Sequence, residues 1–154
     1  MKKENVFTEE EDYWLTGGST GTLPTRVTPS VIRKLSPKEI FVFGSNIKGM
    51  HSGGAARVAY NDFGAEWGNG EGLQGQSYAI PIMEGDDYTK SAIKRFTEFA
   101  IKHEEYMFLV TPVGCGIAGY SPEDIAPLFE TSAHLKNVYL PIVFWRVLLA
   151  NHTR

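Results

Sequence analysis

The 154-residue sequence predicts an α/β protein with three layers, α/β/α, around a mixed central sheet. Short apolar runs alternate along the chain with longer segments whose apolar residues recur at helical spacing. The run 40–43 is rich in β-branched and aromatic residues, which is typical of a strand buried on both faces. A second run, 107–111, repeats the same plan of strand, glycine-bearing loop and helix. In folds of this class, ligands bind at the carboxyl ends of the strands.

The first strand, 40–43, is expected to lead into a helix over 54–63. One face of this helix carries mostly small apolar residues, which let it lie close to the sheet. They are Ala55, Ala56, Val58, Ala59 and Phe63. The next strand is predicted at 77–82, and Pro81 indicates that it either ends there or lies at an edge of the sheet.

A helix over 88–104 follows, because apolar residues recur there at helical spacing. We expect Asp86 or Asp87 to cap its N-terminus, since a carboxylate can accept hydrogen bonds from the first free amides. The run 107–111 is the third strand. These two elements continue the alternation of strands and helices that defines the fold class.

The last part of the chain predicts a helix, a strand and a closing helix. Asp124 is the expected N-cap of the first of these, because Pro127 then falls in the first turn, where proline is tolerated. A fourth strand covers 137–141, and the closing helix covers 144–149. The order of elements from residue 40 onwards is therefore strand–helix repeated four times.

Residues 1–38 show no clear period, and we predict an N-terminal arm or flap ahead of an α/β domain over 39–154. A short helical turn is expected at 31–35. The segment 16–18 is a weak loop signal that adds little to a phosphate-binding hypothesis. Whether the arm covers a binding site is left open by the sequence.

Composition excludes several classes of protein. With 42% hydrophobic and 21% charged residues, the chain is an ordinary globular protein rather than a disordered one. A net charge of −3 gives no reason to expect nucleic acid as a partner. The N-terminus lacks the apolar core of a signal peptide, and no apolar run approaches the length of a membrane span, so we expect a cytoplasmic protein. The oligomeric state is left open.

No metal site or cofactor is expected from the sequence. Cys115 is the single cysteine, so it has no partner for an intramolecular disulfide. No spacing of Cys and His indicates structural zinc, and no cluster of Asp, Glu and His has the spacing of metal ligands.

Two glycine-bearing loops are the candidate binding site, and we interpret them as two walls of one nucleotide site. Glycine lets backbone N–H groups approach an anionic ligand closely, and a helix N-terminus adds further donors. The first loop supplies Gly44, Ser45, Asn46, His51, Gly53, Gly54 and Ala55. The second supplies Gly114, Cys115, Gly116, Ile117, Ala118, Gly119 and Tyr120.

The second loop has the spacing G-x-G-x-x-G after a strand and before a helix. The dinucleotide fingerprint also requires an acidic residue about 20 positions later. The corresponding region, 133–137, contains none, which argues against a Rossmann dehydrogenase. The alternative interpretation is that the glycines only shape a tight turn.

Individual side chains in these loops allow two interpretations each. Asn46 either turns its amide towards a ribose hydroxyl or caps the loop. His51 is either an acid or base at the ligand or an exposed loop histidine. Cys115 is either a nucleophile that needs His51 as its base or a small apolar filler. Tyr120 either stacks on a ribose or base or packs under the following helix.

The glycine-rich stretch 70–78 also allows two interpretations. It either lines the site with Gln76 or Ser77 or forms a structured turn before the strand.

Taken together, these motifs resemble the macrodomain-like superfamily, which binds ADP-ribose. The residues that carry the resemblance are Gly44 to Asn46, Gly53 to Ala56 and Gly114 to Tyr120. More narrowly, the stretch 41–144 resembles a small group of uncharacterised bacterial and phage-associated proteins within that superfamily. The adenine-contacting aspartate of classical macrodomains has no secure match here, and the catalytic Lys/Asp pair of one hydrolase branch is not visible.

The resemblance implies bound ADP-ribose or a related NAD-derived nucleotide. It places Asn46 and His51 at the distal ribose, where they are the candidate catalytic residues if an ADP-ribosyl linkage is hydrolysed. It places the diphosphate on the loop from Gly114 to Tyr120. Two alternatives stay open: a non-catalytic reader or sensor of ADP-ribose in phage–host conflict, and a Cys-His hydrolase of an acyl or amide substrate.

Overall fold

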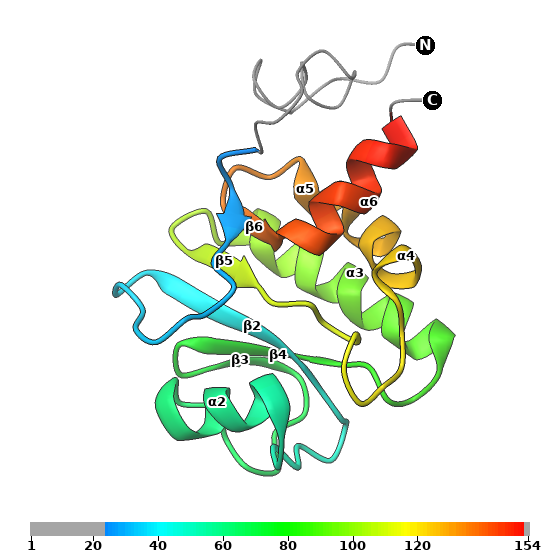
Figure 1. Cartoon of the computed structure of the whole chain (residues 1–154). Helices are drawn as coiled ribbons and strands as arrows, with labels where there is room; N and C mark the ends of the chain where they lie inside the picture. The colour runs from blue at the N-terminus through cyan, green and yellow to red at the C-terminus, as the bar shows by residue number, and fades with distance from the viewer. Residues whose placement is uncertain (1–23, 153–154) are drawn as a thin grey trace.

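The computed structural model describes residues 24–152 of the chain. Within them, six strands form one mixed sheet in the order β1-β6-β5-β2-β4-β3 (Figure 1). The bounds are β1 Val27–Thr28, β2 Glu39–Ser45, β3 Gly72–Gln74, β4 Ser77–Pro81, β5 Met107–Val110 and β6 Val138–Pro141. All neighbouring pairs are parallel except β3 and β4, which form an antiparallel hairpin at one edge. The α/β class and the mixed sheet are thus confirmed.

Helices cover both faces of the sheet, as Figure 1 shows for α2 and α3. Helix α2 spans Gly54–Asp62, and α3 spans Asp86–Lys102. On the same face as α3 lie α4 (Pro122–Ile125), the 3-10 helix η1 (Ala126–Phe129), α5 (Glu130–Ala133) and α6 (Ile142–His152). Because helices cover both faces of the sheet, the strands between them consist of continuous apolar runs.

Alternate side chains of β2 serve the two layers. Phe41 and Phe43 pack in the cluster under α2, whereas Ile40 and Val42 pack in the larger cluster under α3 and α6. All four are at least 96% buried, because their exposed fractions are 4% or less. Burying one such side chain contributes about 1.5–3 kcal/mol before the entropy cost of folding. The strand therefore anchors the middle of the sheet and fixes where its carboxyl end emerges.

The predicted strands and helices from residue 40 onwards follow the predicted order, but one predicted helix is divided into α4, η1 and α5, and β3 was not predicted. Pro81 is the last residue of β4. Since β4 lies between β2 and β3, this strand ends at the proline but is not an edge of the sheet. Of the two positions that Pro81 allowed, an edge strand or a strand end, the structure shows the strand end.

Two predicted helix caps are wrong. Gly85 is the N-cap of α3, and Asp86 and Asp87 lie in its first turn, where their charges still favour the positive end of the helix dipole. Ser121 caps α4, and its hydroxyl and the Asp124 carboxylate form a reciprocal capping box. Pro127 then falls in the first turn of η1 rather than of the helix itself.

The predicted helical turn at 31–35 is also wrong, because these residues have no regular secondary structure. Ile32 and Leu35 instead pack against the cluster under α2. The turn was inferred from a short apolar pattern, and contacts with the sheet layer satisfy that pattern without a helix.

Residues 24–38, part of the predicted arm or flap, contribute strand β1 to the sheet and pack Ile32 and Leu35 against the cluster under α2. Strand β1 pairs with β6 through Val27 opposite Leu140. The Arg26 guanidinium donates to the carbonyl oxygens of Leu135 and Ala133 at 2.7 and 2.8 Å. The indole N–H of Trp145 donates to the Arg26 carbonyl oxygen at 2.8 Å. The remainder of the predicted arm, 1–23, and its loop signal at 16–18 lie outside the described residues.

Candidate functional site

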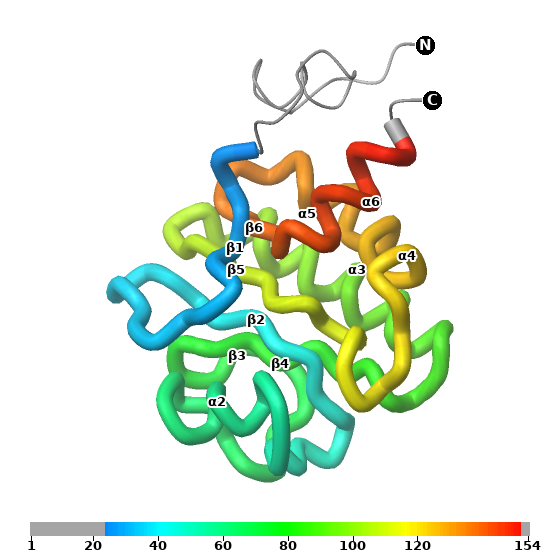
Figure 2. The backbone as a smooth tube through the Cα atoms, in the orientation of Figure 1, coloured from blue at the N-terminus to red at the C-terminus, as the bar shows by residue number. Residues whose placement is uncertain are grey.

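The loops after β2 and β5 lie next to each other at the carboxyl ends of these parallel strands (Figure 2). Together with the end of β4, they line a pocket of about 710 Å³, which we call the loop pocket. Its wall includes Gly44, Ser45, Asn46, Gly53, Gly54, Ala55, Gly114, Gly116, Ile117 and Ala118. The structure therefore brings most of the predicted site residues onto one cavity.

Gly44 makes the close approach of the two loops possible. A Cβ atom at this position would lie 3.1 Å from a side-chain carbon of Ile82 and 3.4 Å from the backbone nitrogen of Gly114. The contact with Ile82 is tight and that with Gly114 is already at van der Waals distance, so a side chain at position 44 would require Ile82 to shift. The absence of a side chain at Gly44 therefore lets the end of β2, Ile82 and Gly114 lie close together.

The N-terminus of α2 forms one wall of this pocket. Its N-cap is Gly53, which offers no side-chain oxygen, and its first turn contains no acidic residue. Within residues 24–152, the amides of Gly54, Ala55 and Ala56 donate no hydrogen bond. Free amides and the helix dipole together give this wall a positive electrostatic character without any charged side chain.

The β5 loop forms the facing wall. Its own turns use the amides of Cys115, Gly119 and Tyr120, which donate to Pro112, Gly116 and Gly114 respectively. In the part of the chain that the structure describes, the amides of the three intervening residues, 116–118, donate no hydrogen bond. All three residues line the pocket. Two groups of N–H donors, from residues 54–56 and 116–118, thus border one cavity. We call them uncommitted, because they have no hydrogen-bond acceptor within residues 24–152.

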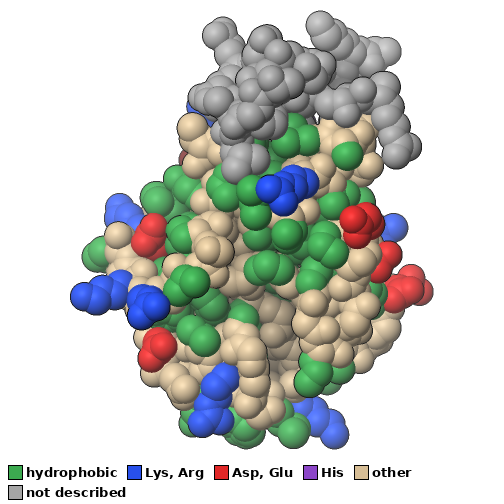
Figure 3. Space-filling view, in the orientation of Figure 1, with side chains coloured by type: hydrophobic (Ala, Val, Ile, Leu, Met, Phe, Trp, Pro, Cys, Tyr) green, Lys and Arg blue, Asp and Glu red, His purple; other side chains and the backbone are tan. Residues whose placement is uncertain are grey.

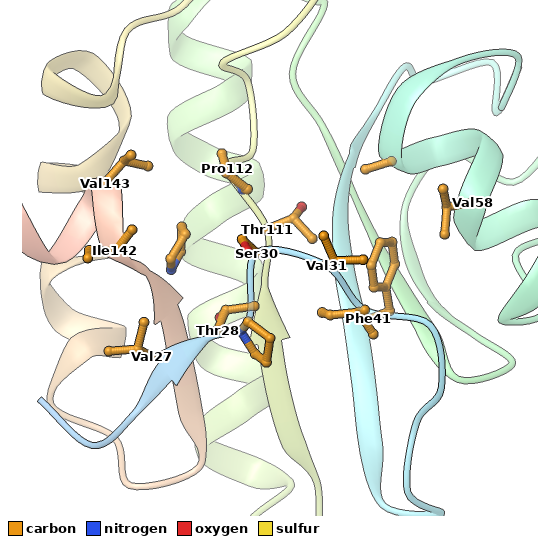
Figure 4. Close-up of a pocket in the computed structure, with 14 residues that line it drawn as sticks. Val27, Thr28, Ser30, Val31, Phe41, Val58, Thr111, Pro112, Ile142 and Val143 are labelled. Atoms are coloured by element: carbon orange, nitrogen blue, oxygen red, sulfur yellow. The ribbon is translucent and has the colours of Figure 1, made fainter.

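A second pocket, of about 640 Å³, adjoins the first and shares Ala55, Thr111 and Pro112 with it. We call it the apolar pocket. Figure 4 shows the segment from Val27 to Val31 running past it, with Phe41 and Val58 on one side and Ile142 and Val143 on the other. Its lining is dominated by aliphatic and proline side chains with one aromatic ring.

Charge is absent from the described lining of both pockets. No Asp, Glu, His, Lys or Arg within residues 24–152 lines either one. The space-filling view agrees, because hydrophobic side chains spread over the middle of the face and most charged side chains lie towards its edges (Figure 3). The two pockets therefore offer backbone donors and apolar surface rather than acid–base groups.

Asn46 lines the loop pocket and also closes its own loop. Its amide nitrogen donates to the Met50 carbonyl oxygen at 3.1 Å, and its amide oxygen accepts from the Met50 N–H at 3.0 Å. A side-chain amide has two N–H groups and two oxygen lone pairs, so one donor and one acceptor remain. Asn46 is thus a loop-closing residue that keeps polar capacity towards the cavity.

His51 does not line either pocket, contrary to its predicted position at the ligand. Its side chain is fully buried, and its Nε2 lies 3.1 Å from the carbonyl oxygen of Asn69. The ring packs edge-on against Phe43 and Trp67. His51 is therefore neither an exposed loop histidine nor a residue that lines the cavity. Its buried ring stabilises the first loop by packing on Phe43 and bonding to Asn69.

Cys115 and His51 belong to clusters on opposite faces of the sheet. Cys115 packs against the cluster under α3 and α6, whereas His51 contacts Phe43 in the other one. Burial, assisted by the carboxylates of Asp124 and Glu123, raises the pKa of the Cys115 thiol. Cys115 does not line the loop pocket, so the structure does not assemble the proposed Cys-His pair.

Tyr120 and Gly119 do not line the pocket either. The Tyr120 hydroxyl donates to a carboxylate oxygen of Asp86 at 2.8 Å, which ties the β5 loop to the start of α3. Its ring lies beneath Gly114, where an added Cβ would come within 3.1 Å of it. Tyr120 therefore supports the loop and ties it to the start of α3.

Gln76 and Ser77 lie in the β3–β4 hairpin and make structural bonds. The Gln76 amide donates to the Ser36 carbonyl oxygen at 3.0 Å, and the Ser77 hydroxyl donates to that of Gln74 at 2.7 Å. The structured-turn interpretation of this stretch is confirmed.

Some residues of the two pockets were not predicted. Met50, Ile82 and Met83 line the loop pocket, and the last two follow β4, the neighbour of β2. The sequence contained this signal, because a predicted strand ends at 82, but strand order was needed to use it. The segment 27–32 lines the apolar pocket, and no pattern in the sequence marked it.

No group of three or more His, Cys, Asp or Glu side chains within residues 24–152 could hold a metal ion. Over the same part of the chain, none of the helices has both the length and the apolar character of a membrane span. No family model, curated protein or solved structure matches this chain.

Proposed function

We propose that this protein binds ADP-ribose or a related NAD-derived nucleotide in the two adjoining pockets, as a reader that does not hydrolyse its ligand. One observation carries the proposal: amides without a hydrogen-bond partner, from two loops, border the loop pocket, and an apolar pocket adjoins it. The motif resemblance to macrodomain-like proteins points to the same ligand.

The diphosphate is assigned to the loop pocket. Backbone N–H groups and a helix N-terminus hold phosphate oxygens without charged side chains, which suits a site that has none in its described lining. Residues 54–56 offer amides from one wall and residues 116–118 from the other. A ligand with two adjacent phosphates engages both walls at once, whereas a single phosphate engages fewer donors.

The nucleobase is assigned to the apolar pocket. A flat heterocycle gains free energy there by leaving water and contacting residues such as Phe41, Val31 and Val143. The shared wall at Ala55, Thr111 and Pro112 places this pocket directly beside the proposed diphosphate site. The proximal ribose then bridges the two.

The distal ribose is assigned to the neighbourhood of Asn46. The amide donor and acceptor that its bonds to Met50 leave free suit a diol, whose hydroxyls both donate and accept. Met50 and Met83, each 49% exposed, line the same pocket and give it an apolar border. ADP has no distal ribose, so contacts at this end of the pocket would favour ADP-ribose over ADP.

The described lining favours binding over hydrolysis. General acid–base catalysis needs a titratable group within hydrogen-bond reach of the reacting atoms. Neither pocket has such a side chain within residues 24–152, and His51, the candidate base, is buried against Asn69. The reader hypothesis is therefore preferred to the ADP-ribosyl hydrolase.

Isothermal titration of the full chain with ADP-ribose tests the proposal, with AMP and NAD as comparators. We expect micromolar affinity for ADP-ribose and clearly weaker binding of AMP, which lacks the second phosphate and ribose. Absence of heat with all three nucleotides contradicts the proposal.

A second assay separates a reader from an enzyme. The protein is incubated with mono-ADP-ribosylated peptides carrying ester, N-glycosidic and other linkages, and free ADP-ribose is followed by chromatography. We expect retention of the peptides without release. Turnover of any linkage overturns the reader assignment while leaving the binding proposal intact.

A further inference from the structure

Thr28, at the end of β1, has a hydroxyl group that the described fold does not use. Its side chain is 4% exposed, and its Oγ1 atom is buried with no hydrogen-bond partner among residues 24–152. Buried hydroxyls nearly always have a partner, because an unpaired one forfeits its bonds to water. Thr28 lines the apolar pocket, so a ligand there can supply that partner.

The other hydroxyls of the apolar pocket are placed differently. Thr111 donates to the carbonyl oxygen of Val42 at 2.8 Å, so its hydroxyl is committed to the sheet. Ser30 is exposed to solvent and keeps its bonds to water. Thr28 is therefore the uncommitted buried polar side chain of the described lining. Rotation about its χ1 angle exchanges the methyl and hydroxyl positions, and a hydrogen bond to a ligand requires the rotamer that presents the oxygen to the cavity.

We propose that Thr28 supplies the polar contact to the purine edge in the nucleobase site, and that this hydroxyl lets the site accept 6-amino and 6-oxo purines alike. This inference rests on the proposed function. A hydroxyl donates to a ring nitrogen or a carbonyl oxygen and accepts from an amino group, so it pairs with either kind of purine edge. A carboxylate only accepts, and would select the amino form. The described lining contains no carboxylate.

Titration of the full chain with ADP and with inosine diphosphate tests the selectivity. These two probes share the ribose and diphosphate and differ at position 6 of the purine. We expect their dissociation constants to agree within about threefold, since the same hydroxyl serves both. A preference above about tenfold for either nucleotide overturns the inference. Such a preference requires a group that only donates or only accepts a hydrogen bond, which a hydroxyl does not do.

Two substitutions test the role of Thr28 itself. Thr28→Val removes the hydroxyl and keeps the shape, and we expect about fivefold weaker binding of both nucleotides. Thr28→Ser keeps the hydroxyl and should bind both as the wild type does. Equal affinity of Thr28→Val and wild type overturns the inference.

Two further measurements complete the test: the melting temperatures of two variants, and the binding of pyrophosphate, which has no nucleobase. Since the Thr28 hydroxyl has no partner among the described residues, Thr28→Val should not lower the melting temperature, whereas Thr111→Val should, because it breaks the bond to Val42. Pyrophosphate should bind Thr28→Val and wild type equally. If ADP-ribose, ADP and pyrophosphate all fail to bind wild type, the proposed function fails. If they bind and Thr28→Val changes nothing, only the role of Thr28 fails.

Discussion

The Nε2 atom of His51 lies 3.1 Å from the carbonyl oxygen of Asn69, and this contact joins the first binding loop to the loop that follows α2. Other bonds reinforce the junction: the Gly68 amide donates to the Gly49 carbonyl oxygen at 2.9 Å, and the Ser45 hydroxyl donates to Gly70. Gly49 has φ +68°, and an added Cβ would lie 2.3 Å from the Asn69 nitrogen. The shape of the binding loop is thus set by a segment that does not line the pocket.

Replacing His51 should therefore cost stability first. We expect His51→Ala to lower the free energy of unfolding by about 2–4 kcal/mol, because it leaves a cavity between Phe43 and Trp67 and removes the bond to Asn69. Urea denaturation followed by circular dichroism measures this loss. His103→Ala is the control, since His103 is partly exposed, and it should cost less than half as much. If His51→Ala instead lost affinity for ADP-ribose with unchanged stability, His51 would be a ligand-contacting residue rather than a structural one.

A negative charge on the β5 loop should abolish binding. Gly116 lines the loop pocket, and an added Cβ there meets no atom within 4 Å, so a side chain is tolerated by the fold. We expect Gly116→Glu to weaken ADP-ribose binding by at least about 100-fold through repulsion of the diphosphate. Gly116→Gln has nearly the same size without the charge and should lose less than about tenfold. Isothermal titration compares the two, and equal losses would indicate bulk rather than charge.

Alkylation of Cys115 should be slow near neutral pH. Its thiol pKa is raised, chiefly by burial, so less of the reactive thiolate is present than in an unstructured peptide. We expect iodoacetamide at pH 7 to modify the folded protein more slowly than the same protein in urea, as followed by mass spectrometry. Faster reaction in the folded state would support the nucleophilic role that the structure does not assemble.

Stability should fall in strongly alkaline solution because of Tyr78. Burial, with a smaller contribution from the Glu71 carboxylate, raises the pKa of Tyr78 from 10.0 to about 12. Above pH 10 the unfolded chain releases this proton while the folded chain keeps it, so the stabilisation is complete below pH 10 and is lost as pH rises towards 12. The loss should reach about 2 kcal/mol.

Denaturant unfolding at pH 9 and pH 11.5 measures this loss, with Tyr78→Phe as the control. The variant removes the Tyr78 contribution and leaves the other tyrosines in place, so its stability should fall less steeply over the same range. Identical pH dependence in the two proteins would show that another group is responsible.

The sequence predicted the four inner strands of the sheet and the two glycine-bearing loops, because these depend on local pattern. The apolar run at 40–43, followed by glycine, marks a buried strand that ends at a loop, whatever the rest of the chain does. Its parallel neighbour β5 carries the second loop, so the two walls meet as predicted. Strand β1 has two residues, too few to produce a period, and the apolar pocket beside it was therefore missed.

Side-chain direction within the loops was not predictable in this way. Whether His51 faces the cavity depends on the loop at Asn69, 18 residues later, and Tyr120 is held by Asp86, 34 residues earlier. Both contacts join segments whose distance apart is fixed only after the sheet has formed. Loop composition therefore located the loop pocket, while long-range packing decided which of the loop side chains line it.

The uncommitted amides of residues 54–56 and 116–118 also determine how the site can be located by experiment. An alanine scan would largely pass over it, since every residue except proline supplies the same N–H group. Exchange of single backbone amides for esters by semisynthesis removes one donor at a time and would locate the contacts directly. Ile117 and Ala118 border the pocket with their backbone amides, so other side chains at these two positions would leave the donors in place.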